Sequence, residues 1–383
     1  MIKKKLIWFD FLRGISALLV CVSHIRNMIF LELSAVEDPN MLTKLFYFVT
    51  GLGHQSVIVF FVLSGYFVGG SVLKKKNNFS WGDYTFSRLS RLWVVLIPAL
   101  LLTVSCDLIT LQITPDIING GINKSWHSGP SFSDPWVVNI KVFAANIFFL
   151  QSILFPVFGT NGPLWSLAYE FWFYALFPLI LSVFGIIASK GLCKKCLLFL
   201  ILAFILLMLP KLAISGFIVW LLGVLVCSFP IKKWKLKSLA LTVFLVLFSS
   251  GICLSKVFLK NDIISDLALA FSLLPIIWFL RDNDVDENSA VGKFSIGTSA
   301  ISFTLYVTHF PVATLLAAAF LKGKQMQPSI SSYAIFIFVT ILAILVSIVM
   351  WWCFERNTMK VKKTLKKFKS ILSSCGRIGV TIK

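Results

Sequence analysis

An arginine and a histidine share one face of the first apolar segment of the chain, residues 6–33. Arg13 and His24 are eleven residues apart. At about 100° per residue, this separation returns to within about 20° of the same helix face and spans about 16 Å. Ionisable side chains are costly inside a bilayer and usually mark a protein interior or wet cavity that has a function. Because an imidazole titrates close to neutral pH, His24 is the leading candidate for a general base that takes a proton from a hydroxyl group.

A purely structural interpretation of these two residues also stays open. Arg13 can extend toward the membrane surface and pair with Asp10, three residues before it. His24 can hydrogen-bond a neighbouring helix without taking part in any reaction. Further ionisable groups at a similar depth favour a function.

Two more titratable side chains are expected near the depth of His24. His309 follows the start of the apolar segment 298–321 by eleven residues, or about 16 Å. Glu170 lies six residues into the fourth apolar segment, about 10 Å from its outer end. We expect the three groups to meet in the central to outer half of a helix bundle, where Glu170 or His309 would orient His24 in a triad-like arrangement. Alternatively, Glu170 is a buried partner of Arg26 or of a histidine.

Arg88 and Arg91 begin the third apolar segment and, three residues apart, lie on one helix face. Two guanidinium groups on one face can bind a single anionic group, with Arg13 as a third candidate ligand. The alternative is the ordinary excess of basic residues at the cytoplasmic ends of membrane helices. Nearby polar and aromatic residues are candidates for substrate contact or for packing: Asp10, Ser64, Tyr66, Trp165, Ser166, Tyr169 and Tyr306. Ser64 lacks a nucleophile-elbow pattern, and the small residues around it suit close helix packing.

The composition is typical of a membrane protein with many spans. Of 383 residues, 58% are hydrophobic and 37 are phenylalanine, which is too apolar for an ordinary soluble protein. The net charge of +20 does not indicate nucleic-acid binding, because the basic residues gather in short loops beside apolar segments. Eight cysteines are scattered, and Cys193 with Cys196 alone cannot make a structural zinc site, so no metal is expected. The first apolar segment is expected to stay as a span and not to be cleaved.

An all-α bundle of about ten transmembrane helices is predicted from segments of roughly 20 apolar residues. These segments are approximately 7–30, 46–73, 92–113, 164–188, 196–210, 212–230, 238–256, 263–281, 298–321 and 332–354. The segment 137–158 is apolar but contains polar residues, and it is interpreted as interfacial or re-entrant. This topology places 26 of the 36 basic residues on one side and eight on the other. Both termini are therefore predicted to be cytoplasmic.

The predicted domain organisation is a membrane domain, 1–355, followed by a basic cytoplasmic tail, 356–383. The tail is expected to lie on the anionic inner leaflet.

The chain resembles the membrane acyltransferase-3 family of O-acyltransferases in five segments that occur in family order. They are Phe9-Asp-Phe-Leu-Arg13-Gly14 followed by His24; Phe60-Phe-Val-Leu-Ser64-Gly65-Tyr66; Arg88-x-x-Arg91; Leu164-Trp-Ser-Leu-x-Tyr-Glu170 with Phe173-Tyr174 and Phe177-Pro178; and Leu305-Tyr306-x-x-His309-Phe-Pro311. Each segment is weakly specific alone, and the five together in this order are specific.

The resemblance implies transfer of an acyl group, usually acetyl, from cytoplasmic acyl-CoA to a hydroxyl of an extracytoplasmic polysaccharide. Lipopolysaccharide O-antigen, capsule, another exopolysaccharide, a lipid-linked glycan, peptidoglycan or a small glycosylated product would be the acceptor, and a bacterial inner membrane the location. Arg88 and Arg91, with Arg13, would bind the CoA phosphates, and His24 would act as base or as a transient acyl carrier. Acyl-CoA would be a co-substrate, with no bound cofactor. No oligomeric state is predicted.

Two functions of other classes remain alternatives. A transporter or flippase of a lipid-linked sugar would use the intramembrane histidine and glutamate as proton-coupling groups. The sequence shows no internal repeat of the kind common in secondary transporters. A noncatalytic partner in polysaccharide assembly would not need charged groups in its core.

Overall fold

The computed structural model describes residues 6–118, 126, 128–129, 136–187, 192–230, 236–259, 262–283 and 285–367. Of the described residues, 81% are helical, and pairing of β type among them is confined to two isolated bridges, Phe30–Met326 and Gln151–Phe155. The prediction of an all-α polytopic membrane bundle is confirmed.

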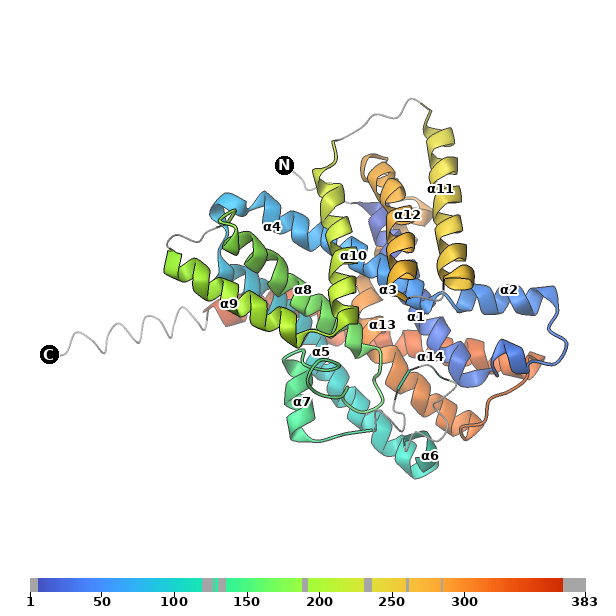
Figure 1. Cartoon of the computed structure of the whole chain (residues 1–383). Helices are drawn as coiled ribbons and strands as arrows, with labels where there is room; N and C mark the ends of the chain where they lie inside the picture. Colours follow the sequence, from blue (N-terminus) through green and yellow to red (C-terminus); the bar gives the residue numbers. More distant parts are fainter. Residues whose placement is uncertain are drawn as a thin grey trace.

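The described part of the chain contains fourteen labelled α-helices (Figure 1) and a further helical stretch at residues 358–367. They are α1 (Ile7–Ile29), α2 (Met41–Thr50), α3 (Gly53–Ser64), α4 (Gly70–Lys74), α5 (Trp81–Ile113), α6 (Pro115–Ile118), α7 (Ile140–Ile147), α8 (Leu164–Val183), α9 (Leu192–Met208), α10 (Lys211–Ser228), α11 (Lys237–Cys253), α12 (Asp262–Asp282), α13 (Ala290–Leu321) and α14 (Ile330–Cys353). Short 3₁₀ turns lie at Leu33–Ala35 (η1), Lys76–Asn78 (η3) and Glu355–Asn357 (η6), and π-helical turns at Gly65–Gly69 (η2) and Leu254–Phe258 (η5).

Nine stretches of the described residues are long and apolar enough to cross a membrane, and α9, with 17 residues, falls just short. The relative direction of α1 and α13 indicates whether α9 crosses the membrane. Arg13 contacts Ser299 and His24 contacts His309, so these two helices run parallel. Two spans that run in the same direction must be separated along the chain by an odd number of membrane crossings. Among the described residues, six candidate spans lie between α1 and α13 when α9 is not counted, and seven when it is. Counting α9 as a crossing agrees with the ten spans predicted.

The segment 137–158 does not cross the membrane as a helix. Its only helix within the described residues, α7, has eight residues, about 12 Å. Trp93 of α5 donates its indole N–H to the carbonyl of Ile147 at 2.9 Å and so fixes the end of α7. Asn146 accepts from the backbone N–H of Phe158 at 3.1 Å and donates to the carbonyl of Pro156 at 3.2 Å, which holds the returning chain.

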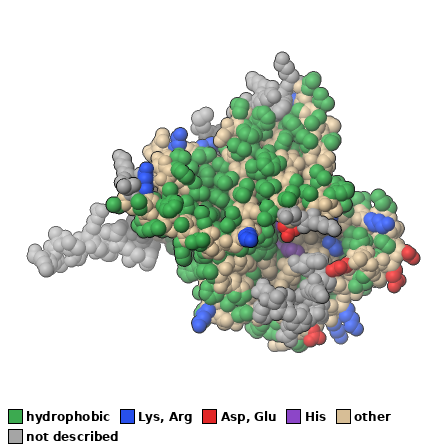
Figure 2. Space-filling view, viewed as in Figure 1, with side chains coloured by type: hydrophobic (Ala, Val, Ile, Leu, Met, Phe, Trp, Pro, Cys, Tyr) green, Lys and Arg blue, Asp and Glu red, His purple; other side chains and the backbone are tan. Residues whose placement is uncertain are grey.

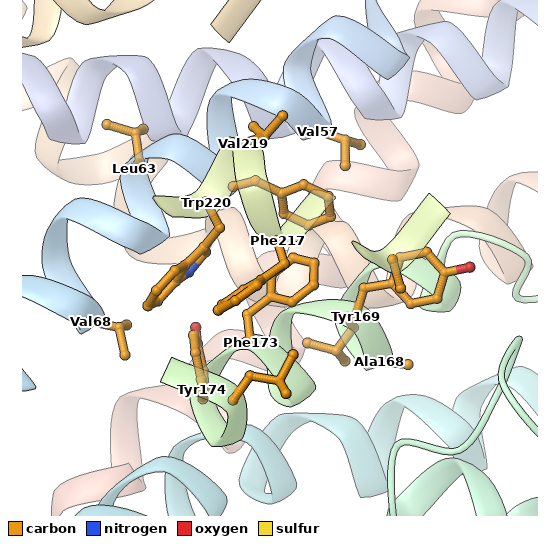
Figure 3. Close-up of a cluster of buried hydrophobic side chains, with 14 of the residues drawn as sticks. Val57, Leu63, Val68, Ala168, Tyr169, Phe173, Tyr174, Phe217, Val219 and Trp220 are labelled. Carbon is orange, nitrogen blue, oxygen red and sulfur yellow. The ribbon is translucent and has the colours of Figure 1, made fainter. Parts of the chain in front are cut away.

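Close backbone contact joins α3 to α10. A Cβ on Gly223 would lie 1.9 Å from the carbonyl oxygen of Val62, and one on Gly65 would lie 1.9 Å from that of Trp220. Only glycine permits this approach. Phe173, Phe217 and Trp220 pack into the junction beside it (Figure 3). The small residues after Ser64 therefore serve helix packing, which is the interpretation that the sequence favoured for them.

Large apolar side chains cover the outside of the bundle. Exposed hydrophobic residues concentrate on α9, α11 and α14. Figure 2 shows a broad hydrophobic area across one face, with few Lys, Arg, Asp or Glu side chains inside it and most of them near its edges. Such a surface suits contact with lipid hydrocarbon.

The helix that follows α14 does not leave the bundle at the predicted boundary. After η6 the chain is helical again from residue 358 to 367. Lys362 donates to the Ser87 hydroxyl at 3.1 Å, so this helix packs against the start of α5. The rest of the predicted tail, 368–383, lies outside the described residues.

Candidate functional site

His24 and His309 form a direct pair in the middle of the bundle. His24 Nδ1 lies 2.9 Å from His309 Nε2, and the two rings are nearly parallel, at 2°. His309 is completely buried, whereas His24 is partly exposed. Helices α1 and α13 supply the two residues, and the small side chains of Gly14 and Thr298 let these helices approach closely.

The hydrogen bonds of the pair define its tautomers. His309 Nδ1 lies 2.8 Å from the carbonyl oxygen of Leu305. A carbonyl only accepts, so Nδ1 carries the proton and Nε2 of a neutral His309 has a lone pair. That lone pair accepts the Nδ1–H of His24. His24 Nε2 is then the unprotonated nitrogen, and it is available to accept a proton or to attack an electrophile.

A separate cavity of about 330 Å³ lies among α1, α3, α5, α8 and α13. Its polar lining consists of Arg13, Ser64, Ser71, Arg88, Arg91, Ser166, Glu170, Tyr174, Ser302 and Tyr306. Arg91 is exposed at its mouth and Arg88 is half-buried. The predicted grouping of the three arginines on one cavity is therefore present in the structure.

Within the described ranges neither Arg88 nor Arg91 forms an ion pair, although Glu355 interacts electrostatically with Arg91. Arg88 lies over the rings of Tyr84 and Tyr174, at 5.5 and 5.8 Å, and its buried Nε has no hydrogen-bond acceptor. A buried guanidinium N–H without an acceptor is costly. This arrangement fits an anionic ligand.

Arg13 is placed differently from the other two arginines. Its guanidinium donates to Ser299 at 3.2 Å and to Asp10 at 3.5 Å, and it lies 5.1 Å from the ring centre of Phe67. Asp10 also accepts from Ser299, at 2.8 Å. Arg13 is thus held by protein groups at the cavity wall, with part of its charge already balanced.

Glu170 does not join the histidine pair as expected. It lines the cavity, and its carboxylate accepts from the Tyr174 hydroxyl at 2.6 Å. Tyr174 in turn accepts from Ser64 at 3.3 Å, and Ser64 accepts from the indole of Trp220 at 3.1 Å. Figure 3 shows Tyr174 and Trp220 approaching each other from α8 and α10. Ser166, one turn before Glu170 on α8, is the residue that reaches toward the histidines through Tyr306. The expected group of three titratable residues is therefore a pair of histidines, and the carboxylate of Glu170 lies apart from them on the cavity.

Tyr306 connects the cavity to the histidine pair. Its hydroxyl hydrogen-bonds Ser166 and donates to the carbonyl of Pro163, and its ring lies 6.2 Å from that of His309. Phe60 packs edge-on against Tyr306, with ring centres 5.9 Å apart. Neither histidine lines the cavity, so these two aromatic rings form its boundary on the histidine side.

The remaining aromatic candidates lie outside the cavity lining. Tyr66 packs edge-on against Phe9, with ring centres 4.8 Å apart, and Trp165 packs against Tyr169 at 5.2 Å. These contacts fit the packing interpretation of the three residues. Contact of these three residues with a substrate stays a prediction.

A buried aspartate that the sequence analysis did not single out orders the chain beside the histidines. Asp107 of α5 accepts from the Thr160 hydroxyl at 2.6 Å, the Thr160 backbone N–H at 2.9 Å and the Trp136 indole at 2.9 Å. The next residue, Asn161, donates to the carbonyl of Val307 at 2.8 Å, within the turn of α13 that precedes His309. The sequence signal that could have identified Asp107 is its position as an ionisable residue inside the third apolar segment.

We expect Asp107→Ala to lower the thermal unfolding temperature of the purified protein clearly more than Ser105→Ala. The substitution leaves three donors of Thr160 and Trp136 without their acceptor, and each buried unsatisfied donor costs about 1–3 kcal/mol. Ser105 is exposed on the same helix and bonds only its own helix carbonyl, which makes it the matched control. Equal unfolding temperatures for the two variants in detergent would contradict the ordering role of Asp107.

The family comparison matches almost the whole described chain. The model of the acyltransferase-3 family, with the description acyltransferase domain, matches residues 6–352. This range contains the histidine pair and the complete cavity lining. No curated protein and no solved structure matches the chain.

Proposed function

The chain belongs to the acyltransferase-3 family, and we propose that it transfers an acyl group, in most cases acetyl, from cytoplasmic acyl-CoA to a hydroxyl of an extracytoplasmic polysaccharide. The family makes it a multi-pass membrane acyltransferase. The observation that carries the finer proposal is the spatial order along α1 and α13. Arginines that form no ion pair in the described part of the chain lie at one end of a cavity, and a histidine pair lies beyond its other end.

The cavity is the proposed donor site. Arg88 and Arg91 would bind the phosphates of CoA through charge-assisted hydrogen bonds. Their lack of protein acceptors leaves these donors available. The excess of basic residues on this side of the predicted topology supports a cytoplasmic opening. The pantetheine arm would extend along the cavity toward Tyr306 and would pass its ring to bring the thioester to the histidines.

His24 is the proposed catalytic base. Its Nε2 takes the proton of the acceptor hydroxyl while that oxygen attacks the thioester carbonyl carbon. The carbon–sulfur bond then breaks, and the CoA thiolate leaves and takes the proton from the imidazolium. His309 fixes the tautomer of His24 and stabilises its charged form through the hydrogen bond between them. A variant of the same route forms an acyl-histidine first and transfers the acyl group to the hydroxyl second.

The acceptor belongs to the far side of the membrane in this proposal. O-antigen of lipopolysaccharide, capsule, another exopolysaccharide or a lipid-linked glycan provides the hydroxyl, and a bacterial inner membrane is the proposed location. His24 is partly exposed while His309 is buried, so His24 is the member of the pair that an acceptor can reach.

Reconstitution tests this function against a transporter. The purified protein is placed in liposomes with radiolabelled acetyl-CoA on one side and a surface glycan on the other, and ester-linked label on the glycan is measured by mass spectrometry and counting. We expect label on the glycan that hydroxide removes. Movement of a lipid-linked sugar across the bilayer with no covalent change would instead favour the transporter.

A further inference from the structure

The helix that follows η6 brings two lysines to the mouth of the arginine cavity. Lys362 donates to the hydroxyl of Ser87 at 3.1 Å, and Ser87 directly precedes Arg88 on α5. Lys366 lies 5.9 Å from the ring centre of Phe86. Lysines four residues apart lie on one face of a helix, so both side chains meet the same turn of α5.

The charges at this place are unbalanced. The charged groups that act on Lys362 are Arg88, Arg91 and Lys366, all cations. The acidic groups that the neighbouring elements contribute are Asp10 on α1, Asp83 on α5, Glu170 on α8 and Glu355 on η6. Asp10 pairs with Arg13 and Glu170 bonds Tyr174. Glu355 bonds Thr304 and interacts electrostatically with Arg91, so it balances part of one charge. Among the described residues no carboxylate forms an ion pair with the four cations. Four cations gathered in this way favour a ligand with several negative charges.

The same helix carries its other lysines on a different face. Lys360, Lys363 and Lys367 follow the spacing of one helix face and are exposed. That face suits the anionic lipid surface expected for the tail. Lys362, in contrast, is half-buried and bonded to the protein. One face of this helix therefore provides the lysines to be tested, and the other face provides control lysines. The whole helix lies after the family match, which ends at residue 352.

We infer that Lys362 and Lys366 bind a phosphate of the donor that is separate from the phosphates held by Arg88 and Arg91. The donor site would then take a thioester of a nucleotide with phosphates at two positions, which in CoA are the diphosphate bridge and the ribose 3′-phosphate. Arg88 lies within the cavity and Lys362 beside its mouth, so the lysine pair suits the outermost phosphate. The inference rests on the proposed donor site.

Equilibrium binding tests this assignment without requiring transfer. Binding of CoA and of 3′-dephospho-CoA is measured for the full chain in phosphatidylcholine nanodiscs, for the wild type, for Lys362→Gln/Lys366→Gln and for Lys360→Gln/Lys363→Gln. We expect the wild type and the control to prefer CoA by about tenfold or more, the range of a charge-assisted hydrogen bond. The Lys362/Lys366 variant should bind both ligands equally, at the wild-type affinity for 3′-dephospho-CoA.

The outcomes separate this inference from the proposed function. Full preference for CoA in the Lys362/Lys366 variant, or no preference in the wild type, overturns the inference. If the variant keeps that preference and loses only binding to phosphatidylglycerol vesicles, the lysines bind lipid headgroups and the inference is again overturned. Failure of the proposed function would appear elsewhere, as absence of glycan acylation by the wild type in the liposome assay.

Discussion

Replacing His24 by alanine is expected to reduce acyl transfer by about 10²–10⁴-fold, the usual contribution of a general base, and to abolish it if His24 carries the acyl group. The reason lies in the hydrogen bonds of the pair. His309 is committed to the Leu305 carbonyl and to His24, and this leaves His24 Nε2 as the nitrogen with a free lone pair. The measurement is initial-rate acylation of a surface glycan in liposomes at saturating acetyl-CoA, with KM for the donor determined in parallel.

The chain provides a matched control in His54. This histidine also lies on an apolar helix, but it is exposed, bonds Asp266 at 2.7 Å and lies in neither the cavity lining nor the pair. His54→Gln should keep near-normal activity. His309→Ala should reduce the rate less than His24→Ala, because it removes the orienting group and leaves the base. The double variant should fall little further than His24→Ala alone, as expected for residues that act as a unit. Near-normal transfer by His24→Ala, with normal insertion and folding, would exclude His24 from the reaction.

Local sequence features were sufficient to predict the spans and two pairs of the site. Apolar length and helix periodicity depend only on neighbouring residues. They therefore place Arg88 beside Arg91 and put Arg13 on the same face as His24. Both members of the second pair meet α13 in the structure, at Ser299 and His309. The eleven-residue spacing is repeated approximately on both parallel helices, so the depth argument was correct for His24 and His309.

The position of Glu170 depends on information that the sequence of α8 alone does not contain. Its depth was estimated from one helix, whereas its neighbours depend on how α8 is rotated about its axis and shifted along α13. In the structure Ser166 reaches Tyr306, and Glu170, one turn later, faces the cavity. Asp107 was missed for a related reason. Its role arises from a loop more than 50 residues later in the chain, at Thr160.

Local sequence patterns also could not predict that the helix after η6 packs against the start of α5. A run of lysines after the last span predicts contact with an anionic leaflet, and a helical repeat does not show that one of its faces packs on α5. That contact depends on where the helix after η6 lies relative to the start of α5.

Replacing both Arg88 and Arg91 by glutamine is expected to raise KM for acyl-CoA by about 100-fold or more while kcat at saturating donor changes little. Each charge-assisted hydrogen bond to phosphate contributes about 1.5–3 kcal/mol, and both guanidinium groups lie on the cavity without an ion pair in the described part of the chain. The single substitution Arg88→Lys should raise KM by a smaller factor, since lysine keeps the charge but loses the planar fork. Steady-state rates over a range of acetyl-CoA concentrations give both constants.

The control for these variants must remove charge from the same membrane side without touching the cavity. Lys194 and Lys195 at the start of α9 fulfil this condition, because neither lines the cavity. Both lie between the fourth and fifth predicted spans, a connection that the predicted topology places on the cytoplasmic side. Lys194→Gln/Lys195→Gln should leave KM near its normal value. If it raises KM as strongly as the arginine variant, the effect is a general attraction of the anionic donor to a basic surface, which salt would weaken. If the arginine variant lowers kcat at unchanged KM, Arg88 and Arg91 act in the chemical step and not in donor binding, because a lost ground-state contact raises KM first.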